Sequence, residues 1–107
     1  MDFPMNITLD LLGPFAETVF MAHTAAGLVP LALSEVKELP RRGLPEQFRT
    51  PLSMVFAGPA ELLLAEGNYF LDHPQLGRLE LYLWPISTPQ PPRQIELGKQ
   101  CYQVSLS

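Results

Sequence analysis

Only a few residues in this chain have side chains suited to metal binding or nucleophilic catalysis. The two histidines and the single cysteine are His23, His73 and Cys101. With Asp72 or Glu80 they could form a metal site, but no pair has the i, i+4 or Cys-x-x-Cys spacing typical of such sites. We therefore expect no metal. His73 directly precedes a proline, and we expect its ring to hydrogen-bond a backbone carbonyl in a turn.

Covalent and acid–base catalysis are equally poorly supported. A Cys101–His73 pair could act as nucleophile and base, but a reactive thiol needs an open, electropositive surrounding. Cys101 instead lies in an alternating C-terminal segment with no basic cluster nearby. The acidic residues are dispersed, and the glycines never cluster as a phosphate-binding loop. The sequence therefore predicts a protein that is not an enzyme and has no cofactor.

Charge and composition narrow the partners and the cellular location. The net charge of −4 argues against a nucleic-acid binder, and we expect the basic doublet Arg41-Arg42 to lie in a solvated loop. The first residues lack a secretory signal, and no apolar run approaches the ~18 residues of a membrane helix. We expect a cytoplasmic protein that binds no membrane, unless a larger assembly carries it out of the cell.

The length and the prolines predict one domain of short strands. A chain of 107 residues with 47% hydrophobic residues is expected to form a single core over residues 1–107. Twelve prolines separate its apolar runs and leave little room for long helices. We expect a capped helical turn over residues 8–12, a loop over 40–50, a turn or short helix over 60–66, and a proline-rich connector over 87–99.

Period-two alternation predicts the strands. Val29, Leu31 and Leu33 share one face, and the phase then slips, as a β-bulge near Ser34-Glu35 would produce. The segment 18–22 is apolar on both faces through Val19 and Met21, which predicts a second covered face, either beneath another part of this chain or beneath a partner. Further alternating segments cover residues 52–56, 69–73, 79–84 and 102–106.

Residues 67–85 read as a β-hairpin whose register can be tested by parity. A four-residue loop would pair odd positions with even ones and split the apolar set across both faces. A five-residue connection, or a bulge at Gly77, would keep Tyr69 and Leu71 on one face with Leu79, Leu81 and Leu83. We therefore expect an irregularity at Gly77.

With those residues inside, three aromatic side chains of the hairpin point outward. Aromatic residues beside an arginine are enriched at the centres of protein interfaces. The alternative is that a helix or the 87–99 connector covers them as a second core layer. If they are uncovered, the candidate interface consists of Phe70, Arg78, Tyr82 and Trp84.

Five motifs follow one another along the chain in a distinctive order. They are Phe56-Ala57-Gly58-Pro59, Gly67-Asn68-Tyr69, His73-Pro74-Gln75-Leu76-Gly77, Leu79-Glu80-Leu81-Tyr82-Leu83-Trp84-Pro85-Ile86 and Tyr102-Gln103-Val104-Ser105-Leu106. In this order they resemble a small bacterial family of uncharacterised domains of about a hundred residues, and the resemblance covers nearly the whole chain. The resemblance implies no known activity. It implies an association with phage-tail-collar-like fibre proteins, and so a structural or accessory role.

These observations predict an all-β or mainly β fold. We expect about six antiparallel strands in a small roll, sandwich or partly open barrel, with one or two short helical turns. The first hypothesis for function is a non-enzymatic subunit that binds a protein partner or itself. The second is a small-ligand-binding β domain with an internal apolar pocket.

Overall fold

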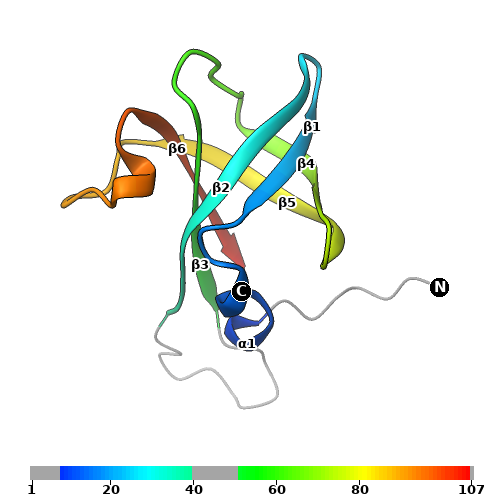
Figure 1. Cartoon of the computed structure of the whole chain (residues 1–107), viewed down its shortest axis with the longest axis vertical. Coiled ribbons are helices and arrows are strands. Elements are labelled where there is room, and N and C mark those ends of the chain that lie inside the picture. Colours follow the sequence, from blue (N-terminus) through cyan, green and yellow to red (C-terminus); the bar gives the residue numbers. More distant parts are fainter. Residues whose placement is uncertain (1–7, 40–50, 107) are drawn as a thin grey trace.

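Six β-prone segments, separated by turns and loops, form the strands of a computed structural model that describes residues 8–39 and 51–106 (Figure 1). Alternating or wholly apolar sequence marks each of them. The strands are β1 (Val19–Thr24), β2 (Gly27–Glu38), β3 (Leu52–Pro59), β4 (Gly67–His73), β5 (Gly77–Ile86) and β6 (Lys99–Leu106). The expected loop over 40–50 lies outside the described residues.

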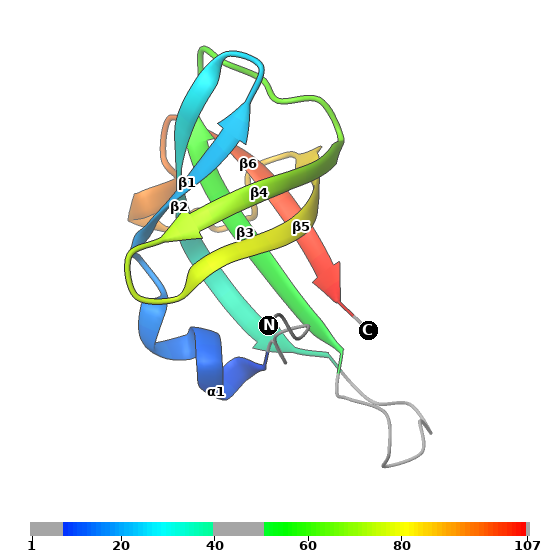
Figure 2. The same ribbon diagram turned by 90° about the vertical axis from the view of Figure 1, so that its right-hand side faces the viewer.

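The strands close into an antiparallel barrel in the order β1-β2-β3-β6-β5-β4, with β4 returning to β1 (Figure 2). β3 and β6 pair over their full length, from Leu52↔Leu106 to Pro59↔Lys99. β1 and β4 pair only through Met21↔Asp72 and Ala22↔Leu71. The prediction of a mainly β antiparallel fold is confirmed, and the barrel is closed rather than partly open.

The irregularity expected in β2 is present. The register between β2 and β3 shifts between Leu33 and Glu35, as a β-bulge requires. Leu31 and Leu33 lie inside the barrel and are fully buried. The bulge turns the following residue, Ser34, to the outer surface of β2, where it is also buried. From there, Ser34 donates a hydrogen bond to Glu96 of the connector.

The β4–β5 hairpin has the predicted parity with a shorter loop. Leu71 pairs with Leu79, and His73 pairs with Gly77, so three residues rather than five connect the strands. Gly77 has φ of +82°, a left-handed conformation that other residues rarely adopt. Odd positions therefore pair with odd positions. The leucines of β5 face the interior, and the intervening residues face outward.

Large side chains fill the interior of the barrel. The rings of Phe20 and Phe56 meet edge to face with centroids 5.4 Å apart. The Tyr102 hydroxyl accepts a hydrogen bond from the Leu64 backbone N–H at 2.9 Å. Beside these rings the core contains Leu12, Ala22, Val29, Leu31, Leu33, Leu52, Met54, Leu64, Leu71, Leu79, Leu81, Leu83 and Val104.

One end of the barrel carries the predicted helical turn. Helix α1 (Leu9–Leu12) begins after Thr8, whose hydroxyl oxygen accepts a hydrogen bond from the Leu11 N–H at 3.1 Å. The 3-10 turn η1 (Gly13–Phe15) follows directly. Residues 60–66 form a turn and irregular chain, so the turn rather than the short helix is correct. Within residues 8–39 and 51–106, no helix is long and apolar enough to cross a membrane.

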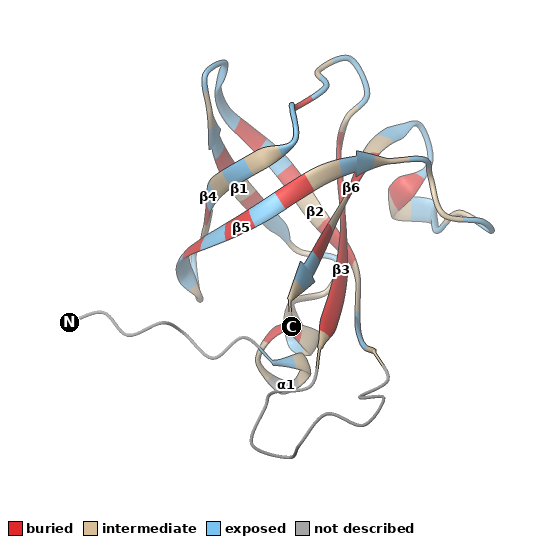
Figure 3. Cartoon of the chain, turned by 180° about the vertical axis from the view of Figure 1, so that it is seen from behind, coloured by how far each residue is buried: buried red, intermediate tan, exposed pale blue. Residues whose placement is uncertain are grey.

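The connector 87–98 lies against the outside of β2 and β6, and its Glu96 accepts a hydrogen bond from Ser34 of β2. It contains the 3-10 turn η2 (Gln94–Glu96), which contacts β2 and β6. Val55, Ala57 and Cys101 are buried in a small cluster on this outer side, with Ile86 packed against it. β3 is consequently buried on both faces, as Figure 3 shows by its red colour along the strand.

Candidate protein-binding surface

Four side chains of the hairpin form a continuous outward surface, here called the aromatic strip: Phe70, Arg78, Tyr82 and Trp84. Phe70 on β4 is 46% exposed and Tyr82 on β5 is 42% exposed, whereas Trp84 is half-buried. Phe70 pairs with Glu80 and Tyr82 pairs with Asn68, so the two rings are diagonal neighbours across the hairpin. All four residues of the sequence-predicted interface therefore lie together on one face.

Arg78 holds one end of the strip in place. Its guanidinium lies over the Phe70 ring, 5.3 Å from the centroid. The same group donates to both carboxylate oxygens of Asp72, from Nε at 2.8 Å and from a terminal nitrogen at 3.2 Å. This two-point contact fixes the plane of the guanidinium and with it the stack on Phe70.

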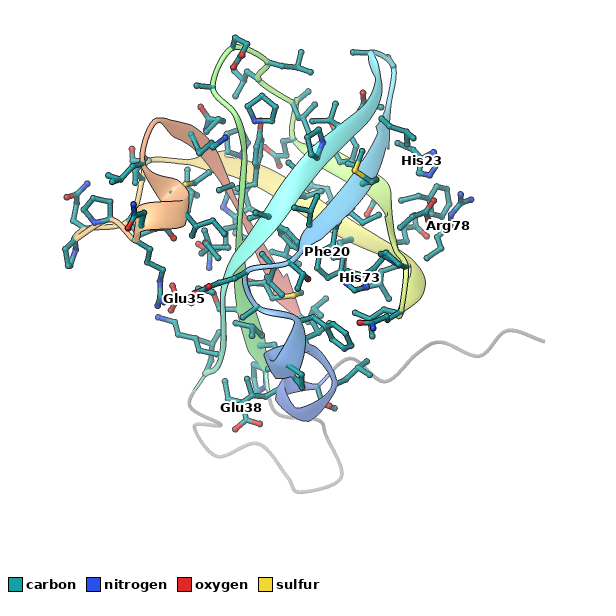
Figure 4. All side chains as sticks on the ribbon, viewed as in Figure 1. Phe20, His23, Glu35, Glu38, His73 and Arg78 are labelled. Atoms are coloured by element: carbon teal, nitrogen blue, oxygen red, sulfur yellow. The ribbon has the colours of Figure 1, made fainter. Side chains whose placement is uncertain are left out.

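His23 on β1 completes this polar cluster (Figure 4). Its Nε2 lies 2.6 Å from Asp72 Oδ2, and Figure 4 shows His23 and Arg78 side by side on the outside of the barrel. Hydrogen bonds from Arg78, and then from His23, hold the pKa of the Asp72 carboxyl far below its usual range. The cluster therefore presents an ionised carboxylate flanked by two nitrogen donors.

We expect Arg78→Gln to raise the pKa of Asp72 toward its ordinary value. Because the pKa is lowered in the folded chain, the stabilisation by Asp72 is present above its ordinary pKa and is lost as the pH falls through the folded value. Carbon-13 NMR titration of the carboxyl would measure the change. An unaltered Asp72 titration in Arg78→Gln would contradict this assignment of the cause.

The other end of the strip is held by a second carboxylate. The Tyr82 hydroxyl donates to Glu66 at 2.5 Å, and this bond raises the pKa of the phenol. The Tyr82 and Trp84 rings lie 6.3 Å apart between centroids, inclined at 50°. The two exposed rings of the strip, Phe70 and Tyr82, thus both have neighbours that restrict their rotamers, while large parts of both side chains reach solvent.

The proline-rich connector, which the sequence offered as a possible cover for the aromatic residues, does not lie on the strip. The 87–98 connector contacts β2 and β6 through η2, on the side of the barrel away from the β4–β5 turn (Figure 1). In β1, which neighbours β4, Val19 is 48% exposed. Within this chain the second face of segment 18–22 is therefore uncovered at Val19, and its cover by a partner stays a prediction.

His73 has a structural role, with a different hydrogen bond from the one expected. Its buried ring lies between Phe15 and Phe20, with centroids 4.9 and 4.6 Å away. Nδ1 accepts from the Gln75 backbone N–H at 3.1 Å, where a bond to a carbonyl was predicted. Nε2 therefore carries the proton and donates to Thr18 Oγ1 at 3.0 Å. The ring joins the N-terminal segment to the β4–β5 turn.

Cys101 lies beneath the connector, in surroundings unlike those of a nucleophile. Burial, and then the charge of Glu96, raise the pKa of the thiol. None of the hydrogen bonds of His73 involves Cys101. Within the described part of the chain, no three His, Cys, Asp or Glu residues are grouped closely enough to hold a metal ion.

One buried polar pair, Ser34 and Glu96, was not expected from the sequence. Glu96 is completely buried and accepts hydrogen bonds from Ser34 Oγ at 2.7 Å and from the Arg93 backbone N–H at 2.9 Å. The second bond is half of a capping box around η2. In the sequence, the three-residue spacing of Arg93 and Glu96 was the only local indication of this capping box. This pair fastens the connector to the β2 bulge.

The comparisons with known proteins support the expected membership of a small family of uncharacterised domains. A family model described as a domain of unknown function, DUF6916, matches residues 7–105. No curated protein matches the chain, and no solved structure does. The match covers nearly the whole length and therefore both the barrel and the aromatic strip. The chain belongs to the DUF6916 family of domains of unknown function.

Proposed function

We propose that this domain binds a protein partner through the aromatic strip. The observation that carries the proposal is that Phe70 and Tyr82 are 46% and 42% exposed while neighbouring groups hold both rings in position. Restrained aromatic side chains lose little conformational entropy when a partner covers them. An arginine lies within the same patch, as in many interface hot spots.

The packing of the barrel favours this function over the binding of a small ligand inside it. The side chains of Phe20, Phe56 and Tyr102 extend into the barrel and are at most 1% exposed. A ligand of ordinary size occupies at least about 300 Å³, and such a molecule would have to displace several of these rings. The exposed rings outside the barrel need no such rearrangement to contact a partner.

We further propose that the partner is a subunit of a larger assembly, of the phage-tail-like or fibre type. The support is the sequence resemblance, which implies an association with phage-tail-collar-like fibre proteins. The low fraction of charged residues, 17%, also fits a chain that is partly covered by other subunits. Self-association through the same strip is the second form that such an interaction could take.

The test compares two doubly substituted chains in an affinity pull-down from native lysate. In the first, Phe70→Ser and Tyr82→Ser remove the exposed rings of the strip. In the matched control, Leu28→Ser and Leu97→Ser remove apolar side chains that are 57% and 56% exposed outside the strip. Circular dichroism and thermal melting first establish that both chains are folded.

We expect the wild type and the control to hold the same protein, and the strip variant to lose it by tenfold or more, roughly 1.4 kcal/mol or above. Light scattering of the purified chain reports self-association on the same three samples. Equal capture by the two variants, with equal scattering, would contradict the proposed surface.

A further inference from the structure

The Tyr82–Trp84 end of the strip combines aromatic faces with two carboxylates. The two rings are inclined at 50° with centroids 6.3 Å apart. The carboxylate of Glu66 accepts a hydrogen bond from the Tyr82 hydroxyl. The exposed Glu80 precedes Tyr82 by two positions, so both side chains lie on the same outward side of β5. Aromatic faces and carboxylates both attract cations, and here they occur together.

Within residues 8–39 and 51–106, no basic side chain lies within ion-pair distance of either carboxylate. The ion pairs of this part of the chain join His23 and Arg78 to Asp72, and Lys37 and Arg93 to Glu35. The Tyr82–Trp84 end is therefore acidic and aromatic, and its charge is complementary to a basic group from outside.

The other end of the strip shows how such a group would be bound. There, the Arg78 guanidinium lies over the Phe70 ring and donates to both oxygens of Asp72. An aromatic face and a carboxylate thus hold one guanidinium within the chain itself. An aromatic face and a carboxylate occur together a second time on β5 and directly before β4, in Tyr82, Trp84, Glu80 and Glu66.

We propose that Tyr82, Trp84, Glu66 and Glu80 bind an arginine side chain of the protein partner. The inference rests on the proposed function, and it specifies the chemistry that the partner brings to this end of the strip. A guanidinium is planar, so it can stack on a ring while its N–H groups reach a carboxylate. An ammonium group is not planar, so it can pair with the carboxylate charge but cannot stack on the ring.

The test uses a short peptide as the probe. Acetyl-Gly-Arg-Gly-Arg-Gly-amide is titrated into the intact chain, and the fluorescence of Trp84, the only tryptophan, reports occupancy. The control replaces each arginine by citrulline, which keeps the shape and removes the charge. We expect millimolar-range binding of the arginine peptide, roughly fivefold or more tighter than the citrulline peptide and weakened by added salt.

Substitutions then locate the site. Glu80→Gln and Glu66→Gln should each weaken the arginine peptide by roughly two- to fivefold, because each removes one charge beside the rings. Glu61→Gln, an exposed carboxylate outside the strip, should leave the affinity unchanged. Equal affinity for arginine and citrulline peptides, or equal losses in all three variants, would overturn the proposal.

The two proposals can fail separately. If the arginine peptide does not bind but the Phe70→Ser/Tyr82→Ser chain still loses its partner in the pull-down, the arginine proposal is wrong and the binding surface stands. If that chain retains its partner as well, the surface itself is wrong. Fluorescence changes with free arginine that match those with the peptide would show a small-cation site and contradict a protein segment as the occupant.

Discussion

Phe20→Ala is expected to lower the free energy of unfolding by about 3–5 kcal/mol. Phe20 is fully buried, and its ring contacts both Phe56 and His73. Deleting it removes apolar contact area and leaves a cavity where β1 meets the interior. The surrounding strands cannot collapse into this space, because the closed barrel fixes their separation. Urea denaturation monitored by circular dichroism measures the loss.

The adjacent position provides the control for Phe20→Ala. Val19 lies on the same strand but is 48% exposed, so Val19→Ala is expected to change the unfolding free energy by no more than about 0.5 kcal/mol. A loss below about 1 kcal/mol for Phe20→Ala, or equal losses at the two positions, would show that β1 does not pack with the described alternation.

Glu96→Ala is expected to cost about 2–4 kcal/mol. The substitution removes a buried acceptor from Ser34 Oγ and from the Arg93 backbone N–H, which then lose a charge-assisted hydrogen bond each. It also loosens the connector beside Cys101, whose thiol lies near both Thr88 and Glu96. Two measurements follow, the denaturation midpoint and the rate at which a thiol reagent modifies Cys101, the only cysteine.

Both measurements should change in the same direction. The wild-type thiol is buried and its pKa is raised, so it should react slowly. In Glu96→Ala it should react faster, because the cover is looser and the neighbouring negative charge is gone. Glu35→Ala is the control, since among the described residues its carboxylate makes only ion pairs of 3.5 and 3.8 Å. An unchanged midpoint with an unchanged thiol rate would refute the anchoring role of Glu96.

Much of the barrel was predictable because period-two alternation assigns each strand residue to a face. The leucines of β5 were placed inside and Phe70, Tyr82 and Trp84 outside by parity alone. The leucines are buried and Phe70 and Tyr82 are exposed, whereas Trp84 is half-buried. The break in alternation after Leu33 located the β2 bulge for the same reason. The length of the hairpin loop was harder to predict, since Gly77 could satisfy the parity with either three or five connecting residues.

The path of the connector was not predictable, because contacts between residues far apart in the sequence determine it. Ser34 and Glu96 are separated by 62 positions, and no periodicity links them. The alternation of β3 indicated one buried face, and its second buried face depends on where the connector lies. The same uncertainty concealed whether the aromatic strip was covered. Sequence alternation thus placed the candidate residues on one face, but only the fold showed that Phe70 and Tyr82 are exposed there.

The central claim is that the strip contacts a protein partner, and site-specific photocrosslinking in the native cell tests it most directly. Tyr82 is replaced by p-benzoylphenylalanine in one chain, and Leu97, which is 56% exposed and lies in the connector, is replaced in another. The account predicts that light produces a discrete crosslinked protein, or a dimer of this chain, from position 82 only. Crosslinks from position 97 with none from position 82 would contradict it.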